Sequence, residues 1–379
     1  MDNGQITRIE WATLQGARPR AAGCNARLPA HGRQVRLPIV RLTTGDGAAG
    51  FGRADAAGAQ ALLGQRLESV FALEPGAGVG EPWFRFEYPI LDLAGRRSGV
   101  PVYKLAAAIN EVEPPHALRA PCYDTSLYFD DLHLVGTQQA ADLIASEARE
   151  GLSAGHRAFK IKVGRGAMHL PLAEGTERDI AIIRAVREAV GPGCTLMIDA
   201  NNGYNLNLAK QVLEATRDCD VFWIEEAFHE DPALYRELKR WQGVQGLNVL
   251  VADGEGDAAS GLLSWARDGL VDAIQYDIFG MGFTRWLRTG RQLDAWGVRS
   301  APHHYGGHYG NYATCHLAAA ITGFAYAEWD EVTTPGLDAS AYAIDEGHVI
   351  VPDAPGFGLE LDEDLFQHAV RSNGGIAQL

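Results

Sequence analysis

Three short apolar segments, each ending in acidic residues, constrain the fold of this chain most. They are TLMIDAN from Thr195, VFWIEE ending at Glu226 and VLVADGE ending at Glu255. Short apolar runs rich in β-branched residues are typical of strands buried in a parallel sheet. The terminal acids Asp199, Glu225 and Glu255 follow one another at steps of 26 and 30 residues, about the length of a strand, a helix and two loops. The three carboxylates should therefore meet at the carboxyl edge of one sheet.

This cluster of acids predicts a site for a divalent cation. Crowded carboxylates repel one another and take up protons unless a cation lies between them, and oxygen ligands suit a hard ion. The third ligand has two candidates, because Asp253 and Glu255 alternate along one segment, and we favour Glu255. Asn201 lies two residues after Asp199 and could face the same space as a hydrogen-bond donor.

The strand period extends through most of the chain. From residue 120, apolar strand-like runs recur at intervals of 25 to 37 residues, with amphipathic helical patterns between them; the runs centre near Asp124, Ile161, Met197, Trp223, Leu250, Gln275, Ser300 and Ala327. Eight strand–helix units of this length predict a (β/α)8-type barrel, a modified TIM barrel, over residues 120–345.

The first 115 residues lack this strand–helix period. Strand-like segments at 5–13 and 34–44 flank a Gly- and Arg-rich loop at 16–33, and helical patterns follow at 56–73 and 84–98. A Pro–Pro pair then marks a boundary, because prolines end helices and stiffen linkers. We therefore expect an α+β domain over residues 1–115. The non-periodic residues 346–379 should form a tail that packs back on this domain.

Charge and cysteine content narrow the class of protein. The formal net charge of −15 argues against binding to nucleic acid or to an anionic membrane. The five cysteines are scattered without metal-ligand spacing, which is typical of a reducing compartment. The N-terminus has no apolar signal core, and no run of 18 apolar residues occurs. We expect a cytoplasmic protein.

Other predicted strands also end in ionisable residues. On the second strand, alternation places Lys160 and Lys162 on one side, where burial and mutual repulsion should lower the pKa of both and make a base. Asp277 ends the sixth strand, and a carboxylate there can orient a histidine at the end of the seventh. That histidine could be either His303 or His304, which are adjacent in the sequence. Glu328 ends the eighth strand.

In combination these strand ends resemble the enolase superfamily, and within it the mandelate racemase subgroup. The stretch EYPILDLAGRRSGVPVYKL is similar to a helix of that family's N-terminal capping domain. The resemblance implies a barrel with an α+β cap, a bound Mg2+ and a small carboxylate substrate. It implies Mg2+ ligands at Asp199, Glu225 and Glu255, a general base at Lys162 assisted by Lys160, an acid/base pair of Asp277 with His303, and a substrate-carboxylate contact at Glu328.

The function that this resemblance implies is proton abstraction next to a carboxylate, through an enediolate. The leading hypothesis is a hydro-lyase that dehydrates an acid sugar to a 2-keto-3-deoxy acid. A racemase or epimerase using the same residues is the runner-up, and a catalytically silent ligand-binding barrel is the alternative outside enzymes. Loops of the cap should choose the substrate, with candidate contacts at Arg53 and three other arginines, Arg18, Arg20 and Arg27. A homo-oligomer is expected by resemblance.

Overall fold

The central element of the fold is a closed barrel of parallel strands. The computed structural model describes residues 4–379. Consecutive strands pair side by side, β13 pairs with β6, and a bridge between Ser300 and Phe324 joins the two ends of the series. The barrel strands are β6 (Leu118–Leu127), β7 (Ala158–Lys162), β8 (Thr195–Asp199), β9 (Val221–Glu225), β10 (Leu250–Asp253), β11 (Ala273–Ile274), β12 (Arg299–Ser300) and β13 (Ala327–Trp329). The predicted barrel is confirmed.

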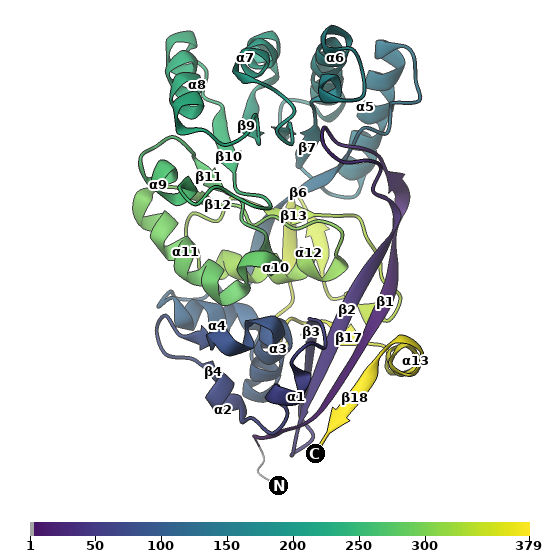
Figure 1. Cartoon of the computed structure of the whole chain (residues 1–379), viewed down its shortest axis with the longest axis vertical. Helices are drawn as coiled ribbons and strands as arrows, with labels where there is room; N and C mark the ends of the chain where they lie inside the picture. Colours follow the sequence, from purple (N-terminus) through teal and green to yellow (C-terminus); the bar gives the residue numbers. More distant parts are fainter. Residues whose placement is uncertain (1–3) are drawn as a thin grey trace.

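Helices cover the outside of the barrel (Figure 1). Side-chain caps begin several of them: Asn205 accepts a hydrogen bond from Leu208 N, and Asp231, followed by Pro232, accepts from Ala233 N. The helices are α5 (Thr137–Ser153), α6 (Leu172–Val190), α7 (Leu206–Ala215), α8 (Pro232–Gln245), α9 (Leu262–Arg267), α10 (Ile278–Met281), α11 (Phe283–Trp296) and α12 (His308–Cys315).

The eighth strand differs from the expected repeat, because no barrel helix follows β13. Pro335 and Gly336 lie six and seven residues after the end of β13, and proline and glycine disfavour a helix there. The chain continues instead through β14 (Leu337–Asp338), β15 (Ala343–Asp345) and β16 (His348–Val351), and β16 pairs antiparallel with β6. The barrel thus has eight strands but lacks the eighth helix among its described residues.

The N-terminal residues form a sheet with helices against it. The sheet has the order β18-β1-β2-β3, with β1 (Ile6–Ala22), β2 (Gly32–Thr44), β3 (Ala49–Arg53) and β18 (Gly375–Gln378). The main helices against it are α3 (Glu87–Ser98) and α4 (Val102–Ile109). The single helix expected over 56–73 is wrong: the chain forms two short helices, α1 (Ala59–Leu62) and α2 (Leu67–Val70), because Gly64 between them has φ +85°.

The loop expected at 16–33 is also shorter than predicted. Strand β1 runs to Ala22, and inward and outward positions alternate along it, with Gly16 and Arg18 buried and Gln15 and Pro19 exposed. The β1–β2 hairpin therefore extends far beyond the rest of its sheet, and Figure 1 shows it rising along one edge of the molecule towards the barrel helices. Its tip, residues 23–31, reaches the barrel, where Cys24 bridges to Phe129.

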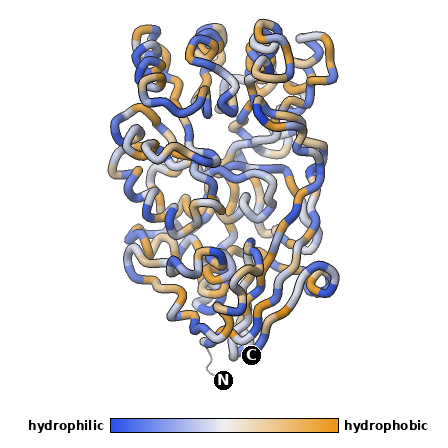
Figure 2. The backbone as a smooth tube through the Cα atoms, in the orientation of Figure 1, coloured by the Kyte–Doolittle hydropathy of each residue, from blue (hydrophilic) through white to orange (hydrophobic). Residues whose placement is uncertain are grey.

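The two ends of the described chain meet on the N-terminal sheet (Figure 1). Strand β18 pairs antiparallel with β1, and α13 (Glu363–Asn373) lies beside them, where Gln367 donates a hydrogen bond to Glu10. Hydrophobic and hydrophilic residues alternate along the barrel helices in Figure 2, as expected for helices with one buried face. Among residues 4–379, no helix combines the length and the apolar character that a membrane span requires.

Candidate active site

Strand alternation builds the site in two layers inside the barrel. The lower layer is an apolar cluster that includes Met197, Trp223 and Ala158. Two positions further along the same strands, the inward residues become Asp199, Glu225 and Lys160. Apolar side chains thus close the floor of the barrel, and ionisable side chains stand above it at the carboxyl ends of the strands, where barrel enzymes carry their chemistry.

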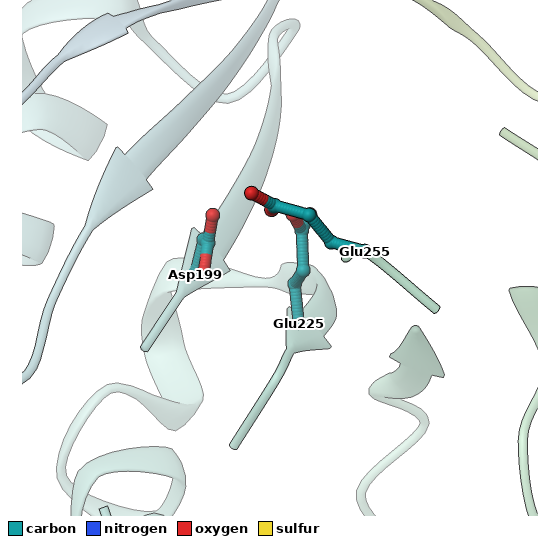
Figure 3. A group of neighbouring side chains, drawn as sticks. All are labelled: Asp199, Glu225 and Glu255. Atoms are coloured by element: carbon teal, nitrogen blue, oxygen red, sulfur yellow. The ribbon is translucent and has the colours of Figure 1, made fainter. Parts of the chain in front are cut away.

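The three acids predicted to bind metal lie together. One oxygen from each of Asp199, Glu225 and Glu255 lies within 4.8 Å of the others, and Figure 3 shows the three carboxylates pointing towards one another. Asp199 and Glu225 are fully buried and pair directly across β8 and β9. Burial and the charge of Asp199 raise the pKa of Glu225 well above its ordinary value, which is the repulsion expected of crowded carboxylates.

The third acid is Glu255, not Asp253. Strand β10 ends at Asp253, and Gly254 has φ +125°, so the simple alternation of the strand stops between the two acids. Asp253 accepts hydrogen bonds from the hydroxyl of Tyr235 on α8 at 2.5 Å and from Gly254 N at 2.8 Å. Glu255 instead turns into the barrel mouth, and its Oε2 is buried without a hydrogen-bond partner among the described residues.

This donor set fits a hard divalent ion. The converging ligand atoms are carboxylate oxygens, and neither a thiolate nor an imidazole belongs to the group. Oxygen-only sites favour Mg2+, Ca2+ or Mn2+ over Zn2+ or Cu2+. Gln275 also holds Glu225 in place, because its amide Nε2 donates a hydrogen bond to Oε2 of Glu225 at 2.8 Å. Asp199, Glu225 and Glu255 are therefore suited to hold such an ion.

The two lysines of β7 are buried among these acids. Nζ of Lys160 lies 2.8 Å from Glu225 and 2.9 Å from Glu328, and Nζ of Lys162 contacts Oδ2 of Asp199. Burial lowers the pKa of each lysine, but the surrounding carboxylates override it and the net direction is upward for both. The sequence-based expectation of a lowered pKa is wrong for this arrangement, because it considered the neighbouring lysine and not the acids of β8, β9 and β13.

The histidine beside Asp277 is His303. Backbone pairing joins the two residues, and Nδ1 of His303 lies 3.2 Å from Oδ2 of Asp277. Asp277 is itself fixed because it caps α10, accepting from Phe279 N at 2.9 Å. Burial lowers the pKa of His303, but the charges of Glu255 and Glu328 and the bond to Asp277 raise it to about 10. His303 thus carries a proton next to the acid cluster.

The second histidine faces a different way. His304 is fully buried, and its Nε2 lies 2.9 Å from the main-chain oxygen of Glu328. Its backbone N donates to the carboxylate of Glu328 at 3.1 Å, and Thr125 Oγ1 donates to the same carboxylate at 2.7 Å. Burial would raise the pKa of Glu328, but the charges of Lys160 and His303 hold it well below its usual range. His304 positions Glu328.

Asn201 and Arg53 lie in different places. Asn201 lines a cavity of about 420 Å³ together with Glu255, and its amide Nδ2 donates to Glu226 at 2.9 Å. Arg27, at the hairpin tip, lines the same cavity. Arg53 ends β3, and its guanidinium stacks 3.9 Å above the ring of Phe279, in a separate pocket beside α10. Its predicted contact with substrate stays a prediction.

Two of the other candidate arginines are engaged in ion pairs. Arg18 donates two hydrogen bonds to Asp330, at 3.0 and 2.8 Å, and both side chains are buried. Arg20 lies between the carboxylates of Asp130, Glu147 and Glu150, at 3.1 to 3.5 Å. Both therefore fasten the hairpin to the barrel.

Sequence reasoning missed Thr125 and Gln275, which hold the two central carboxylates. Gln275 lies two residues before Asp277 and Thr125 two residues after Tyr123 on β6. For Gln275 the signal was a polar residue directly after an apolar strand, because an inward polar side chain needs a partner; Thr125, between Asp124 and Ser126, carried no such signal. Which partner it finds depends on strands that are far away in the sequence.

The chain is similar to known proteins in both sequence and structure. Residues 143–365 match the family model "Enolase C-terminal domain-like". A galacturonate dehydratase from Geobacillus sp. is 46% identical, with a TM-score of 0.93, over 99% of this chain and 100% of that one. That crystal structure contains D-galacturonate and 5-keto-4-deoxy-D-galacturonate.

Two further proteins are also similar to this chain. A mandelate racemase/muconate lactonizing protein from Geobacillus sp., crystallised with magnesium and tartrate, is 46% identical with a TM-score of 0.96, over 100% of this chain and 98% of that one. D-galactarolactone cycloisomerase of Agrobacterium fabrum is 31% identical over 58% of this chain, and the match spans 58% of that enzyme's length.

Proposed function

Because this chain belongs to the enolase superfamily, in its mandelate racemase subgroup, we propose that it is a Mg2+-dependent hydro-lyase that dehydrates an acid sugar. The observation that carries the proposal is the placement of Lys162 and His303 around the acid cluster. Lys162 comes from β7 and His303 from the end of β12, with β6 and β13 between them along one side of the barrel. A base and an acid can therefore reach one substrate from two sides.

The substrate class that we propose is a six-carbon uronate such as D-galacturonate. The relative with 46% identity over the whole chain was crystallised with D-galacturonate and its 5-keto-4-deoxy derivative. In that derivative the keto carbon lies next to the carboxylate and the deoxy carbon follows it. Counted from the carboxylate, this is the 2-keto-3-deoxy pattern expected from the sequence.

The residues of this chain divide the reaction between them. Lys160 stands above the barrel floor, where its charge can pair with a substrate carboxylate, and Glu328, joined to it at 2.9 Å, orients it. Lys162 removes the proton from the adjacent carbon, and His303 delivers its proton to the hydroxyl that leaves from the next carbon as water. The resulting enol then tautomerises to the keto acid. A Mg2+ held by Asp199, Glu225 and Glu255 would neutralise the charge that develops on the carboxylate oxygens during proton removal.

Lys162 must be neutral to accept a proton, and the structure indicates how this can arise. The charges that raise its pKa belong to Asp199, Glu255 and Glu225, the same three acids that are suited to hold the metal ion. If these carboxylates bind a cation, it offsets their negative charge. The main remaining influences on the pKa of Lys162 are then burial and the charge of Lys160, and both lower it. Metal binding and base activation are therefore coupled in this proposal.

The test is proton NMR of acid sugars incubated with the protein and Mg2+ in D2O, with D-galacturonate included. Dehydration predicts loss of the substrate and a new signal from the deoxy carbon, which carries one proton and one deuterium because the enol tautomerises in D2O. Deuterium uptake next to the carboxylate without that signal would replace this proposal by the racemase or epimerase reaction. Silence towards every acid sugar, by protein that binds Mg2+, would contradict the proposed substrate class.

A further inference from the structure

His31 ends the hairpin tip and belongs to an aromatic cluster beside the site. Its ring centroid lies 5.1 Å from that of Tyr128 and 5.1 Å from that of Tyr305, and both rings meet it edge-on. Tyr128 and Tyr305 are stacked on each other at 5.1 Å. Tyr128 directly follows β6, and Tyr305 directly follows the two histidines after β12. The cluster therefore joins the cap to two strand ends of the barrel.

This cluster borders the reacting groups. Nζ of Lys162 lies 5.3 Å from the centre of the Tyr128 ring, so Lys162 and His31 contact the same ring. Burial, followed by the charges of Lys162 and Arg18, lowers the pKa of His31 to about 4, against the opposing charge of Glu255. The imidazole is thus neutral near pH 7 and lies within electrostatic reach of both Lys162 and Glu255.

The imidazole has an unused hydrogen-bonding atom. Nε2 of His31 is buried and finds no hydrogen-bond partner within residues 4–379. The neighbouring cation Arg18 donates to Asp330 and to Gly32 O, and it makes no hydrogen bond with His31 Nε2. By contrast, His169, which contacts the same hairpin tip, bonds Asn25 O at 2.8 Å. A buried polar atom without a partner is costly, so a bound molecule that supplied one would gain affinity.

A substrate held in this site must extend towards the cap, to which His31 belongs. The barrel floor is filled by apolar side chains such as Trp223 and Met197, so a substrate whose carboxylate pairs with Lys160 cannot extend downwards. The remaining carbons must rise past Lys162 towards the cap.

We infer that His31 Nε2 forms a hydrogen bond with an oxygen at the end of the substrate remote from the reacting carboxylate, so that His31 selects six-carbon acids over shorter ones. The inference rests on the proposed function, because it takes the substrate carboxylate to pair with Lys160. His31 determines specificity in this assignment and takes no part in proton transfer.

The experiment measures binding by calorimetry in a Lys162→Ala background, in which turnover is greatly slowed, with Mg2+ present. D-galacturonate is compared with tartrate, an acid that is two carbons shorter. His31→Phe keeps an aromatic ring against Tyr128 and Tyr305 and removes the nitrogen. We expect it to weaken D-galacturonate by about tenfold, as for one lost hydrogen bond, and to leave tartrate within about twofold.

A matched control separates recognition from positioning of the loop. His169→Phe removes the hydrogen bond to Asn25 O, so it should alter D-galacturonate and tartrate affinities by the same factor. His31→Gln, which restores a polar end, should recover part of the D-galacturonate affinity. Equal weakening of both acids by His31→Phe, or no weakening of either, would overturn the inference and leave the dehydratase proposal intact. Failure of the Lys162→Ala protein to bind D-galacturonate, while tartrate binds, would overturn the proposed uronate substrate and the role of His31 with it.

Discussion

Lys162 shows how neighbours determine the chemistry of a residue. Its position on β7 follows from alternation with Ala158 and Lys160, but its protonation depends on Asp199 of the next strand. The contact between Lys162 and Asp199 keeps a positive charge where the proposed mechanism needs a neutral base. The sequence therefore predicts that Lys162 is a candidate base, whereas its neighbours in the structure determine its protonation state.

Replacement of this lysine tests its role directly. Lys162→Ala should retain Mg2+ binding, because the three acids remain, and should lower kcat by about a hundred- to ten-thousand-fold, as for the loss of a general base. Steady-state kinetics and calorimetric titration with Mg2+ would measure the two quantities. The control is Lys210→Ala on α7, which removes a partly exposed ion-pair partner of Glu237 on α8. Normal turnover by Lys162→Ala would contradict the assignment of the base.

The choice between Glu255 and Asp253 can also be tested at single residues. Glu255→Gln should weaken Mg2+ binding by more than about tenfold, because it removes one of three charged ligands. Asp253→Asn should leave Mg2+ affinity nearly unchanged, since that carboxylate is bonded to Tyr235 and Gly254. Calorimetry on the pair of variants is the measurement. The reverse order of effects would exchange the two residues in the site.

At the scale of elements, the β1–β2 hairpin connects the cap with the barrel. Its two strands run for 17 and 13 residues, long enough for the tip to reach the barrel mouth. The ion pair between Arg18 and Asp330 ties its middle to the end of β13. A buried ion pair thus holds the β1–β2 hairpin against the barrel. A hairpin fixed in this way can hold His31 in one position, as its inferred role in specificity requires.

Breaking this ion pair should loosen the hairpin. Arg18→Ala leaves Asp330 buried without its partner, and such a loss costs about 3 kcal/mol of unfolding free energy. Hydrogen exchange measured by mass spectrometry should become faster in the upper part of the hairpin. Arg36→Ala, at an exposed position on β2, is the control. Unchanged exchange and stability in Arg18→Ala would show that other contacts hold the hairpin.

At the scale of the whole molecule, the beginning and the end of the chain form one sheet. Glu10 on β1 is buried beneath Arg41 of β2 and Gln367 of α13, and it also accepts from Arg8. Burial raises the pKa of Glu10, but the hydrogen bonds from Arg8, Gln367 and Arg41 override it and lower the pKa to about 2. This carboxylate joins elements more than 350 positions apart.

The stability that Glu10 contributes should depend on pH. Its folded pKa of about 2 lies below the ordinary 4.5, so the contribution is complete above pH 4.5 and disappears as the pH falls towards 2. Glu10→Gln should lower the unfolding free energy near neutral pH by an amount on the order of 2 kcal/mol. Thermal unfolding of both proteins over a pH series is the measurement. A Tm difference that stayed constant down to the acid limit would contradict this role.

Assembly and location belong to the same scale. The cytoplasmic location, the absence of nucleic-acid and membrane partners and the homo-oligomer expected from the sequence stay predictions. Light scattering after gel filtration would measure the oligomeric state.

The sequence by itself determined the barrel, the order of its strands and the acids and lysines at their ends, because strand alternation and the strand–helix period are local properties of the chain. Only the tertiary structure decided between Asp253 and Glu255 and between His303 and His304, since a single left-handed glycine and one turn of backbone redirect neighbouring side chains. It also decided the charge state of Lys160 and Lys162, because that depends on carboxylates brought from other strands. The length of the hairpin, and with it the place of His31, likewise follows from contacts between segments remote in sequence, which no local pattern records.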